Sequence, residues 1–196
     1  MDRESARGSA YAYNAMAKTH GWAAYCDHTL DFHWPAFEDL REIWNRARAG
    51  ECPPRRAAMT ARLLKDYLRC IAIYERFVDD KGVRRYRARL VGTGYAQVYG
   101  ELTGKVVDEI VSGEKLLRFH LALDQTLKSS APLRIIAAAE IPDKSFLSAE
   151  YFLAPLADDT GTPSMVLICA HFSGERPWVE YFADARARIA AREAAR

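Results

Sequence analysis

The first strongly periodic segment of the chain predicts an amphipathic helix that begins near Pro35 and ends at Gly50. Its apolar residues recur at helical spacing and therefore share one face: Phe37, Leu40, Ile43 and Trp44. Proline suits the first turn because its missing N–H would have no partner there, and glycine commonly ends a helix. A second helical pattern follows in residues 59–68.

The spacing changes at residue 70 to the pattern of a β-hairpin. Residues 70–92 form two runs rich in β-branched and aromatic side chains, separated by a short turn at residues 79–82 that contains glycine. In the second run basic and apolar residues alternate, which predicts one basic face (Arg85, Arg87, Arg89) and one apolar face (Tyr86, Ala88, Leu90).

The remaining patterns predict a helical crossover and three further strands. Short helical pieces fill residues 94–110, and a longer amphipathic helix occupies residues 113–130. Strand-like runs at residues 133–141, 146–157 and 164–172 follow, and the short turns between them favour antiparallel pairing. The last residues, 182–196, form an Ala/Arg-rich helix or a tail.

This order of elements predicts an α+β domain built on a five-stranded antiparallel sheet, with a helical crossover on one face and extra N-terminal helices. A doubly wound parallel sheet does not fit, because the first two strands pair as a hairpin. We divide the chain into a partly helical N-terminal extension at residues 1–36, the domain with its leading helices at residues 37–173, and a C-terminal helix or tail at residues 174–196.

The glycine-rich stretch after the hairpin is not a phosphate-binding loop. Gly92 and Gly94 begin a dinucleotide-binding pattern, but Gln97 stands where that pattern requires glycine or alanine. In residues 100–105, three residues separate the glycines where a P-loop has four, and Val106 replaces the Ser or Thr that binds Mg²⁺. We expect these glycines to allow sharp turns between the strand and short helices.

Charge and cysteine content narrow the class of protein. The 28 basic and 26 acidic residues leave a net charge of +2, so we expect neither nucleic acid nor a membrane surface as a partner. The four cysteines are scattered, which favours reduced thiols and a cytoplasmic protein: Cys26, Cys52, Cys70 and Cys169. The N-terminus lacks the apolar core of a signal peptide, and no apolar run is long enough to span a bilayer.

The stretch from the second strand of the hairpin into the crossover resembles the signature of a bacterial family of PAS-like domains. The matching positions are Tyr86, Arg87, Arg89, Leu90, Val91, Gly92, Thr93, Tyr99, Gly100, Leu102, Thr103 and Gly104. The upstream residues of the same family resemble Trp44, Gly50, Pro53 or Pro54, and Arg55 or Arg56, with slightly altered spacing. Residues 151–172 resemble its last two strands, so the likeness covers roughly Phe37 to Phe172.

The resemblance implies a stand-alone sensory domain. PAS domains have two strands, a run of helices and three strands in one curved antiparallel sheet, which agrees with the order predicted above. They bind small ligands between the sheet and the helices, and many form dimers through flanking helices. The resemblance therefore implies a small-molecule ligand of unknown identity and signalling through a protein partner or a homodimer.

We assign no cofactor. A photoactive flavin or a p-coumaric chromophore would need a cysteine in the crossover, and the segment between Tyr95 and Val111 has none. Haem-binding PAS domains use a histidine of the long helix, and His120 occupies such a position on the apolar face. A partly buried, hydrogen-bonded histidine is the more frequent role for such a residue.

A ligand would lie between the crossover and the inner face of the sheet. The candidate lining residues are Tyr95, Tyr99, Leu116, His120, Leu123, Ile135, Phe152, Cys169 and His171. The alternative is that these side chains only fill the core. No metal site is expected, because the spacing of Cys26, His28, Asp31 and His33 fits no standard zinc site.

Two other functions remain open at this point. The amphipathic helix over residues 37–44 could serve a pure interaction or dimerisation module. A small α+β enzyme could use His120 or His171 as a base, but no catalytic arrangement stands out, and we expect no catalytic residue.

Overall fold

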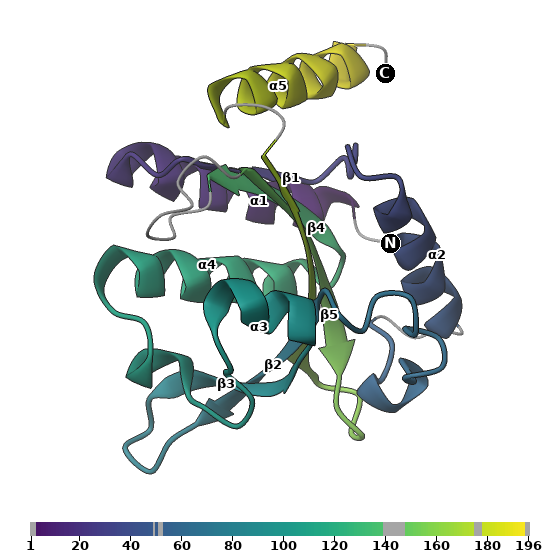
Figure 1. Ribbon diagram of the computed structural model, residues 1–196, viewed down its shortest axis with the longest axis vertical. Helices are drawn as coiled ribbons and strands as arrows, with labels where there is room; N and C mark the ends of the chain where they lie inside the picture. Colours follow the sequence, from purple (N-terminus) through teal and green to yellow (C-terminus); the bar gives the residue numbers. More distant parts are fainter. Residues whose placement is uncertain (1–2, 49, 51–52, 139–147, 175–177, 195–196) are drawn as a thin grey trace.

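The computed structural model describes residues 3–48, 50, 53–138, 148–174 and 178–194. They form one six-stranded antiparallel sheet with helices on both faces (Figure 1). The helices are α1 (Arg3–His20), α2 (Ala36–Ala47), α3 (Thr93–Tyr99), α4 (Gly113–Ser129) and α5 (Trp178–Ala194), with short 3-10 turns at Arg56–Ala58 and Val107–Glu109. The strands are β1 (Ala24–Asp27), β2 (Ile71–Val78), β3 (Arg84–Val91), β4 (Leu133–Ala138), β5 (Ser148–Ala157) and β6 (Pro163–Ser173).

The strand order is β1-β4-β5-β6-β2-β3. The predicted sequence of a hairpin, a helical crossover and three antiparallel strands is confirmed, and so is the α+β class. The sheet has one strand more than predicted, because β1 from the N-terminal segment pairs with the edge of β4, with Ala24 opposite Ala137 and Asp27 opposite Arg134. The division into 1–36, 37–173 and 174–196 stays a prediction.

The two faces of the sheet carry different helices (Figure 1). We call the face covered by α1, α3 and α4 the crossover face, and the opposite one the α2 face. Alternation along β5 shows the division, because Tyr151 and Leu153 belong to the crossover face while Phe152 and Ala154 belong to the α2 face. Each face has its own hydrophobic cluster.

Helix α2 confirms the first predicted helix and packs on the sheet of the same chain. Phe37, Leu40 and Trp44 are fully buried, and the indole N–H of Trp44 donates to the carbonyl oxygen of Pro155 at 2.9 Å. The apolar face that motivated a dimerisation module is therefore buried within the chain.

The second predicted helix, over residues 59–68, is not an α-helix. This segment folds as consecutive turns, in which the N–H of Tyr67 bonds the carbonyl of Leu64 at 2.9 Å and the N–H of Cys70 bonds that of Tyr67 at 2.8 Å. These three-residue steps bring Leu64 and Tyr67 onto the α2 face. Tertiary packing of the two side chains outweighs a modest helical propensity.

The predicted alternation in β3 holds only to Ala88. The register between β2 and β3 shifts at Ile73/Tyr74, so that Tyr86 and Ala88 face the crossover while Leu90 packs on the α2 face. After a bulge of this kind, side chains point to the opposite faces from those that strict alternation predicts. The alternating sequence pattern therefore cannot reveal the change.

A buried ionic network lies at the end of the α2 face nearest β1. The Arg134 side chain is fully buried and donates to Glu150 Oε1 at 2.5 Å and to Asp27 Oδ2 at 3.2 Å. The backbone N–H groups of His33 and Trp34 each donate to Glu150 at 2.9 Å. Burial would raise the pKa of Glu150, but the hydrogen bonds from His33 and the charge of Arg134 outweigh it and lower that pKa.

The same network holds α5 against the sheet. His33 Nε2 lies 2.9 Å from Asp184 Oδ2, and Arg188 Nε lies 2.7 Å from Asp31 Oδ2. Tyr181 packs its ring against His33 with centroids 4.5 Å apart.

None of the described helices combines the length and the apolar character that crossing a bilayer requires.

Candidate ligand-binding site

A cavity of about 470 Å³ lies between the crossover face and helices α1, α3 and α4. Tyrosines from four elements line it: Tyr13 of α1, Tyr74 of β2, Tyr95 and Tyr99 of α3, and Tyr151 of β5. Small or branched apolar side chains complete much of the wall, among them Ala88, Ala122, Leu123, Ala137 and Ile168. The cavity is thus mostly apolar with a few hydroxyl groups, the usual composition of a small-molecule site.

The glycine-rich stretch positions the two tyrosines of α3. A Cβ atom on Gly92 would lie 2.0 Å from the carbonyl oxygen of Leu68, so only glycine fits there. This close approach lets the Gly92 N–H donate to Ile71 at 2.7 Å and the Tyr95 N–H donate to the carbonyl of Arg69 at 2.9 Å. The glycines therefore anchor the start of α3 on the 68–71 segment, a more specific role than a sharp turn.

The tyrosine hydroxyls pair with one another inside the cavity. The hydroxyls of Tyr99 and Tyr151 are hydrogen-bonded, and Tyr74 and Tyr95 line the same cavity close enough to influence each other's pKa. Burial raises the pKa of all four phenols, that of Tyr74 to about 12. The phenols stay neutral at ordinary pH and can orient a ligand as hydrogen-bond donors and acceptors.

Three basic side chains also line the cavity: Lys105, Lys115 and Arg118. Arg118 lines the same cavity as Tyr99 and Tyr151, and its charge partly offsets the rise that burial causes in the pKa of both phenols. Among the described lining residues there is no aspartate or glutamate. The described wall therefore combines basic side chains with tyrosine hydroxyl groups.

Four of the nine predicted lining residues border this cavity: Tyr95, Tyr99, Leu123 and Ile135. Leu116 packs against the same hydrophobic cluster without lining the cavity. His120 also lies outside it, with Nε2 3.1 Å from Asp108 Oδ2 and its ring edge-on to Tyr86 at 5.3 Å between centroids. A role of the nine in binding stays a prediction.

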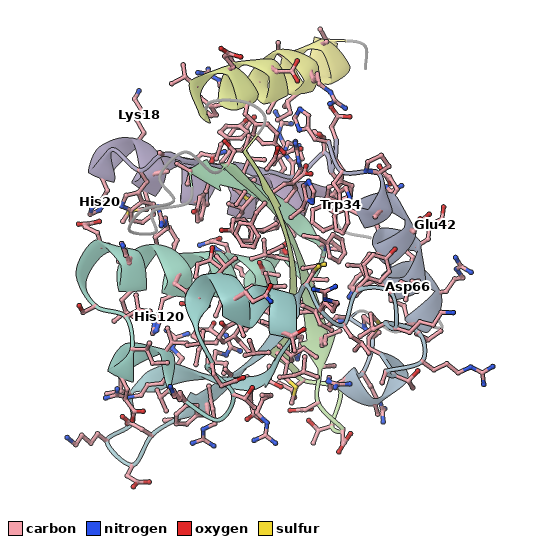
Figure 2. All side chains as sticks on the ribbon, viewed as in Figure 1. Lys18, His20, Trp34, Glu42, Asp66 and His120 are labelled. Carbon is pink, nitrogen blue, oxygen red and sulfur yellow. The ribbon has the colours of Figure 1, made fainter. Side chains whose placement is uncertain are left out.

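The other three predicted residues lie on the α2 face, away from this cavity. Phe152 and Cys169 are paired across β5 and β6 and belong to the cluster of the α2 face. His171 stacks on Trp34, with centroids 4.7 Å apart, on the same side; Figure 2 shows Trp34 beside α2 and His120 beside α4. The prediction assigned these side chains to the crossover face, whereas they lie on the opposite face of the sheet. Both faces of a buried strand are apolar, so the sequence pattern does not distinguish them.

Sequence reasoning missed three of the five cavity tyrosines: Tyr13, Tyr74 and Tyr151. Tyr151 is the neighbour of the predicted residue Phe152 on β5, so the opposite choice of strand face would have identified it. Tyr13 follows Ala6 and Ala10 and precedes Ala17 on one buried helical face of α1, a pattern visible in the sequence.

The cofactor and metal alternatives find no support in this geometry. His120 contacts Asp108 and lies outside the cavity, so it is not placed to bind a haem there. The described cysteines are also absent from the cavity wall: Cys26, Cys70 and Cys169. In the described part of the chain, no three His, Cys, Asp or Glu side chains gather as metal ligands, and Asp31 instead pairs with Arg188.

The family of this chain is shown by a comparison with protein-family models. The family model described as a PAS domain matches residues 32–170, well over half of the chain. One similar solved structure, described as an RNA-binding light-oxygen-voltage receptor, shares 12% identity at a TM-score of 0.40 over 69% of this chain. The match spans only 41% of that receptor chain, and no curated protein is significantly similar. By the extent of its family match, this chain belongs to the PAS domain family.

Proposed function

We propose that this PAS domain is a sensor that binds a small molecule in the cavity of the crossover face and signals through protein contacts. The observation that carries the proposal is the cavity of about 470 Å³ itself, lined by tyrosine hydroxyls and basic groups. Protein interiors are otherwise packed like organic crystals, with few voids larger than a water molecule. A cavity of this size with a mostly apolar lining leaves apolar surface in contact with water unless a ligand fills it.

The wall of the cavity offers a route from ligand to signal. Tyr13 belongs to α1, whereas Phe119 and Ala122 belong to α4, and these two helices pack on each other. A ligand that bridges them would stabilise one arrangement of the helical layer. The surface of that layer is where we expect a protein partner, or a second copy of the chain, to detect occupancy.

Native mass spectrometry of freshly purified protein tests the proposal. We expect a mass above that of the bare chain, lost on denaturation, or specific thermal stabilisation in a screen of small molecules. The matched variant is Ala137→Leu, which places a larger side chain in the cavity from β4. This variant should fold and lose both signals.

The proposal fails if neither assay finds a ligand, or if Ala137→Leu binds the same molecule as well as the unmodified protein. Ala154→Leu serves as a control because Ala154 is buried on the α2 face, away from the cavity. An Ala154→Leu protein that folds should still bind.

A further inference from the structure

We infer that a groove beside the β2–β3 hairpin is the docking site for an acidic peptide segment of a protein partner. The groove lies where the hairpin, the start of β6 and the C-terminal turns of α4 meet, and residues of all three line it. None of its described lining residues borders the ligand cavity. The inference rests on the signalling through protein contacts proposed above and adds the chemical class of the partner.

Strand register places two arginines of the groove close together. Arg76 lies directly opposite Tyr86 across the β2–β3 pair, and Arg84 lies two residues before Tyr86 on β3. Residues opposite each other, and residues two apart on one strand, share a face of the sheet, which here is the crossover face. Arg76 and Arg84 are therefore diagonal neighbours, with Cα atoms roughly 7–8 Å apart.

A hydrogen bond fixes α4 over this part of the hairpin. The hydroxyl of Tyr86 donates to Asp124 Oδ1 at 2.6 Å. Lys128 follows Asp124 by four residues on α4 and therefore lies on the same side of that helix. Lys128 lines the groove together with the two arginines, so the cations come from both the sheet and the helix.

These three cations are not neutralised within the described part of the chain. None of the described carboxylates forms an ion pair with Arg76, Arg84 or Lys128. Arg76 donates from Nη2 to the carbonyl oxygen of Pro163 at 3.2 Å, which is a neutral partner. Asp124 is the single acidic residue among the described lining residues. The wall therefore carries three positive charges against one negative charge and favours an anionic occupant.

The carboxylates of the two neighbouring turns are occupied by their own loops. Asp79, at the tip of the hairpin, accepts two backbone N–H groups of its turn and the Nε of Arg85 at 2.6 Å. Asp158, in the turn before β6, accepts two backbone N–H groups of that turn. Neither carboxylate pairs with the cations of the groove.

Two further features of the groove favour a peptide over an inorganic anion. Gln125 lines it, and Gln125 Oε1 is buried without a hydrogen-bond partner among the described residues. Val78 lies opposite Arg84 in the register and is 62% exposed, and Val83 beside it is 46% exposed. An acidic peptide supplies carboxylates for the cations, backbone N–H groups for the glutamine and apolar side chains for the valines. An inorganic anion supplies only the negative charge.

Helix α4 links this groove to the ligand cavity. Leu123 lines the cavity, and the next residue, Asp124, lines the groove. A ligand that changes the position of α4 would change the spacing between Lys128 and the two arginines. Occupancy of the cavity thus has a direct structural route to the docking site.

Fluorescence anisotropy of two labelled peptides with the full chain tests the inference. The acidic probe is Glu-Glu-Val-Glu-Glu-Gly and its matched neutral probe is Gln-Gln-Val-Gln-Gln-Gly, so their difference in affinity reports the carboxylates. We expect the acidic peptide to bind roughly tenfold more tightly at low salt. This advantage should shrink as salt is added, because surface charges are screened.

Three variants locate the binding. Arg84→Gln and Lys128→Gln change exposed side chains, so both proteins should fold, and each should weaken the acidic peptide several-fold and leave the neutral one unchanged. Arg89→Gln removes the same charge elsewhere on β3, where Arg89 is exposed and pairs with Glu75 at 3.5 Å. This control should change neither affinity.

The inference is overturned if the two peptides bind equally, if neither binds, or if Arg89→Gln weakens the acidic peptide as much as the groove variants do. A uridine oligonucleotide that binds more tightly than the acidic peptide, and loses affinity in the same groove variants, would assign the groove to nucleic acid and also overturn it.

Native mass spectrometry of the same variants keeps this result separate from the ligand cavity. Arg84 and Lys128 do not border the cavity, so a small molecule bound there should be retained in both variants. Failure of peptide binding with a retained ligand refutes the docking site and leaves the ligand sensor standing. Peptide binding with no ligand found refutes the sensor and leaves the docking site standing.

Discussion

The two faces of the sheet are packed differently, although the same strands form both. On the α2 face, aromatic rings fill the space, with centroids 5.4 Å apart for Phe32 and Phe37, 5.9 Å for Phe32 and Phe152, and 4.8 Å for Trp34 and Phe37. On the crossover face, tyrosines pair around a cavity of about 470 Å³. One sheet therefore carries a filled core on one side and a hollow one on the other.

This difference separates stability from binding. The α2 face buries large side chains completely, so its substitutions should act mainly on the free energy of unfolding. The crossover face has room for changes in side-chain volume, so its substitutions should act mainly on ligand affinity. Adjacent residues of one strand, such as Leu153 and Ala154, can test this division directly.

The largest expected effect is on the ionic network of the α2 face. Arg134→Leu leaves Glu150 and Asp27 buried without their partner, which should lower the free energy of unfolding by about 3–5 kcal/mol. Denaturant unfolding followed by circular dichroism measures the change. Arg89→Leu breaks an exposed pair with Glu75 and should cost less than about 1 kcal/mol. Equal losses of unfolding free energy in the two variants would show that the buried network stabilises the fold no more than an exposed ion pair does.

The next effect compares two leucines of β5. Leu156 is fully buried on the α2 face, and Leu153 borders the cavity. Truncation of a buried leucine to alanine costs about 2–5 kcal/mol, and the cost is larger where tightly packed neighbours surround the side chain. We expect Leu156→Ala near the upper end and Leu153→Ala near the lower end, by the same unfolding measurement. The reverse order would mean that the crossover face is packed as tightly as the α2 face.

Replacement of alanine by leucine tests the same difference between the faces by adding side-chain volume instead of removing it. Ala154→Leu overpacks a fully buried position of the α2 face and should cost about 1–3 kcal/mol. Ala137→Leu adds the same atoms next to the cavity and should cost less than Ala154→Leu, with a melting temperature near that of the unmodified protein. A similar loss from both substitutions would contradict an open cavity in the free protein.

The smallest effects at ordinary pH come from titratable groups. Tyr74 on the crossover face affects stability at alkaline pH, and Glu150 on the α2 face affects it at acid pH. Because the pKa of Tyr74 is raised from 10.0 to about 12, its stabilising contribution is complete below pH 10 and is lost as pH rises toward 12. Tyr74→Phe should make the loss of stability over this interval shallower. Unfolding free energies measured across the interval, with Tyr11→Phe as an exposed control, test this expectation.

On the acid side, the lowered pKa of Glu150 stabilises the fold above its ordinary value of 4.5, and this contribution is lost as pH falls below that value. Glu150→Gln should flatten the acid limb of the stability curve and leave the alkaline limb unchanged. An unchanged acid limb would assign acid sensitivity to other carboxylates.

Local periodicity in the sequence determined most of the elements. Helical spacing predicted α2 and α4, and the change to strand patterns predicted the β2–β3 hairpin and the three strands after the crossover. The glycine motif identified the start of α3, because a backbone approach that excludes a Cβ atom leaves a trace in the residue type. These features depend on neighbours in the chain, so they can be read without tertiary structure.

Tertiary structure alone decided the faces, the sixth strand and the cavity. Phe152 and Tyr151 are both large and apolar enough for either side, so only the helices that cover the sheet assign one to the core and the other to the cavity. Strand β1 is four residues long and exists through its pairing with β4, more than a hundred residues away. A cavity is volume that no side chain fills, and this property belongs to the packed assembly of elements, which residue types along the chain do not encode locally.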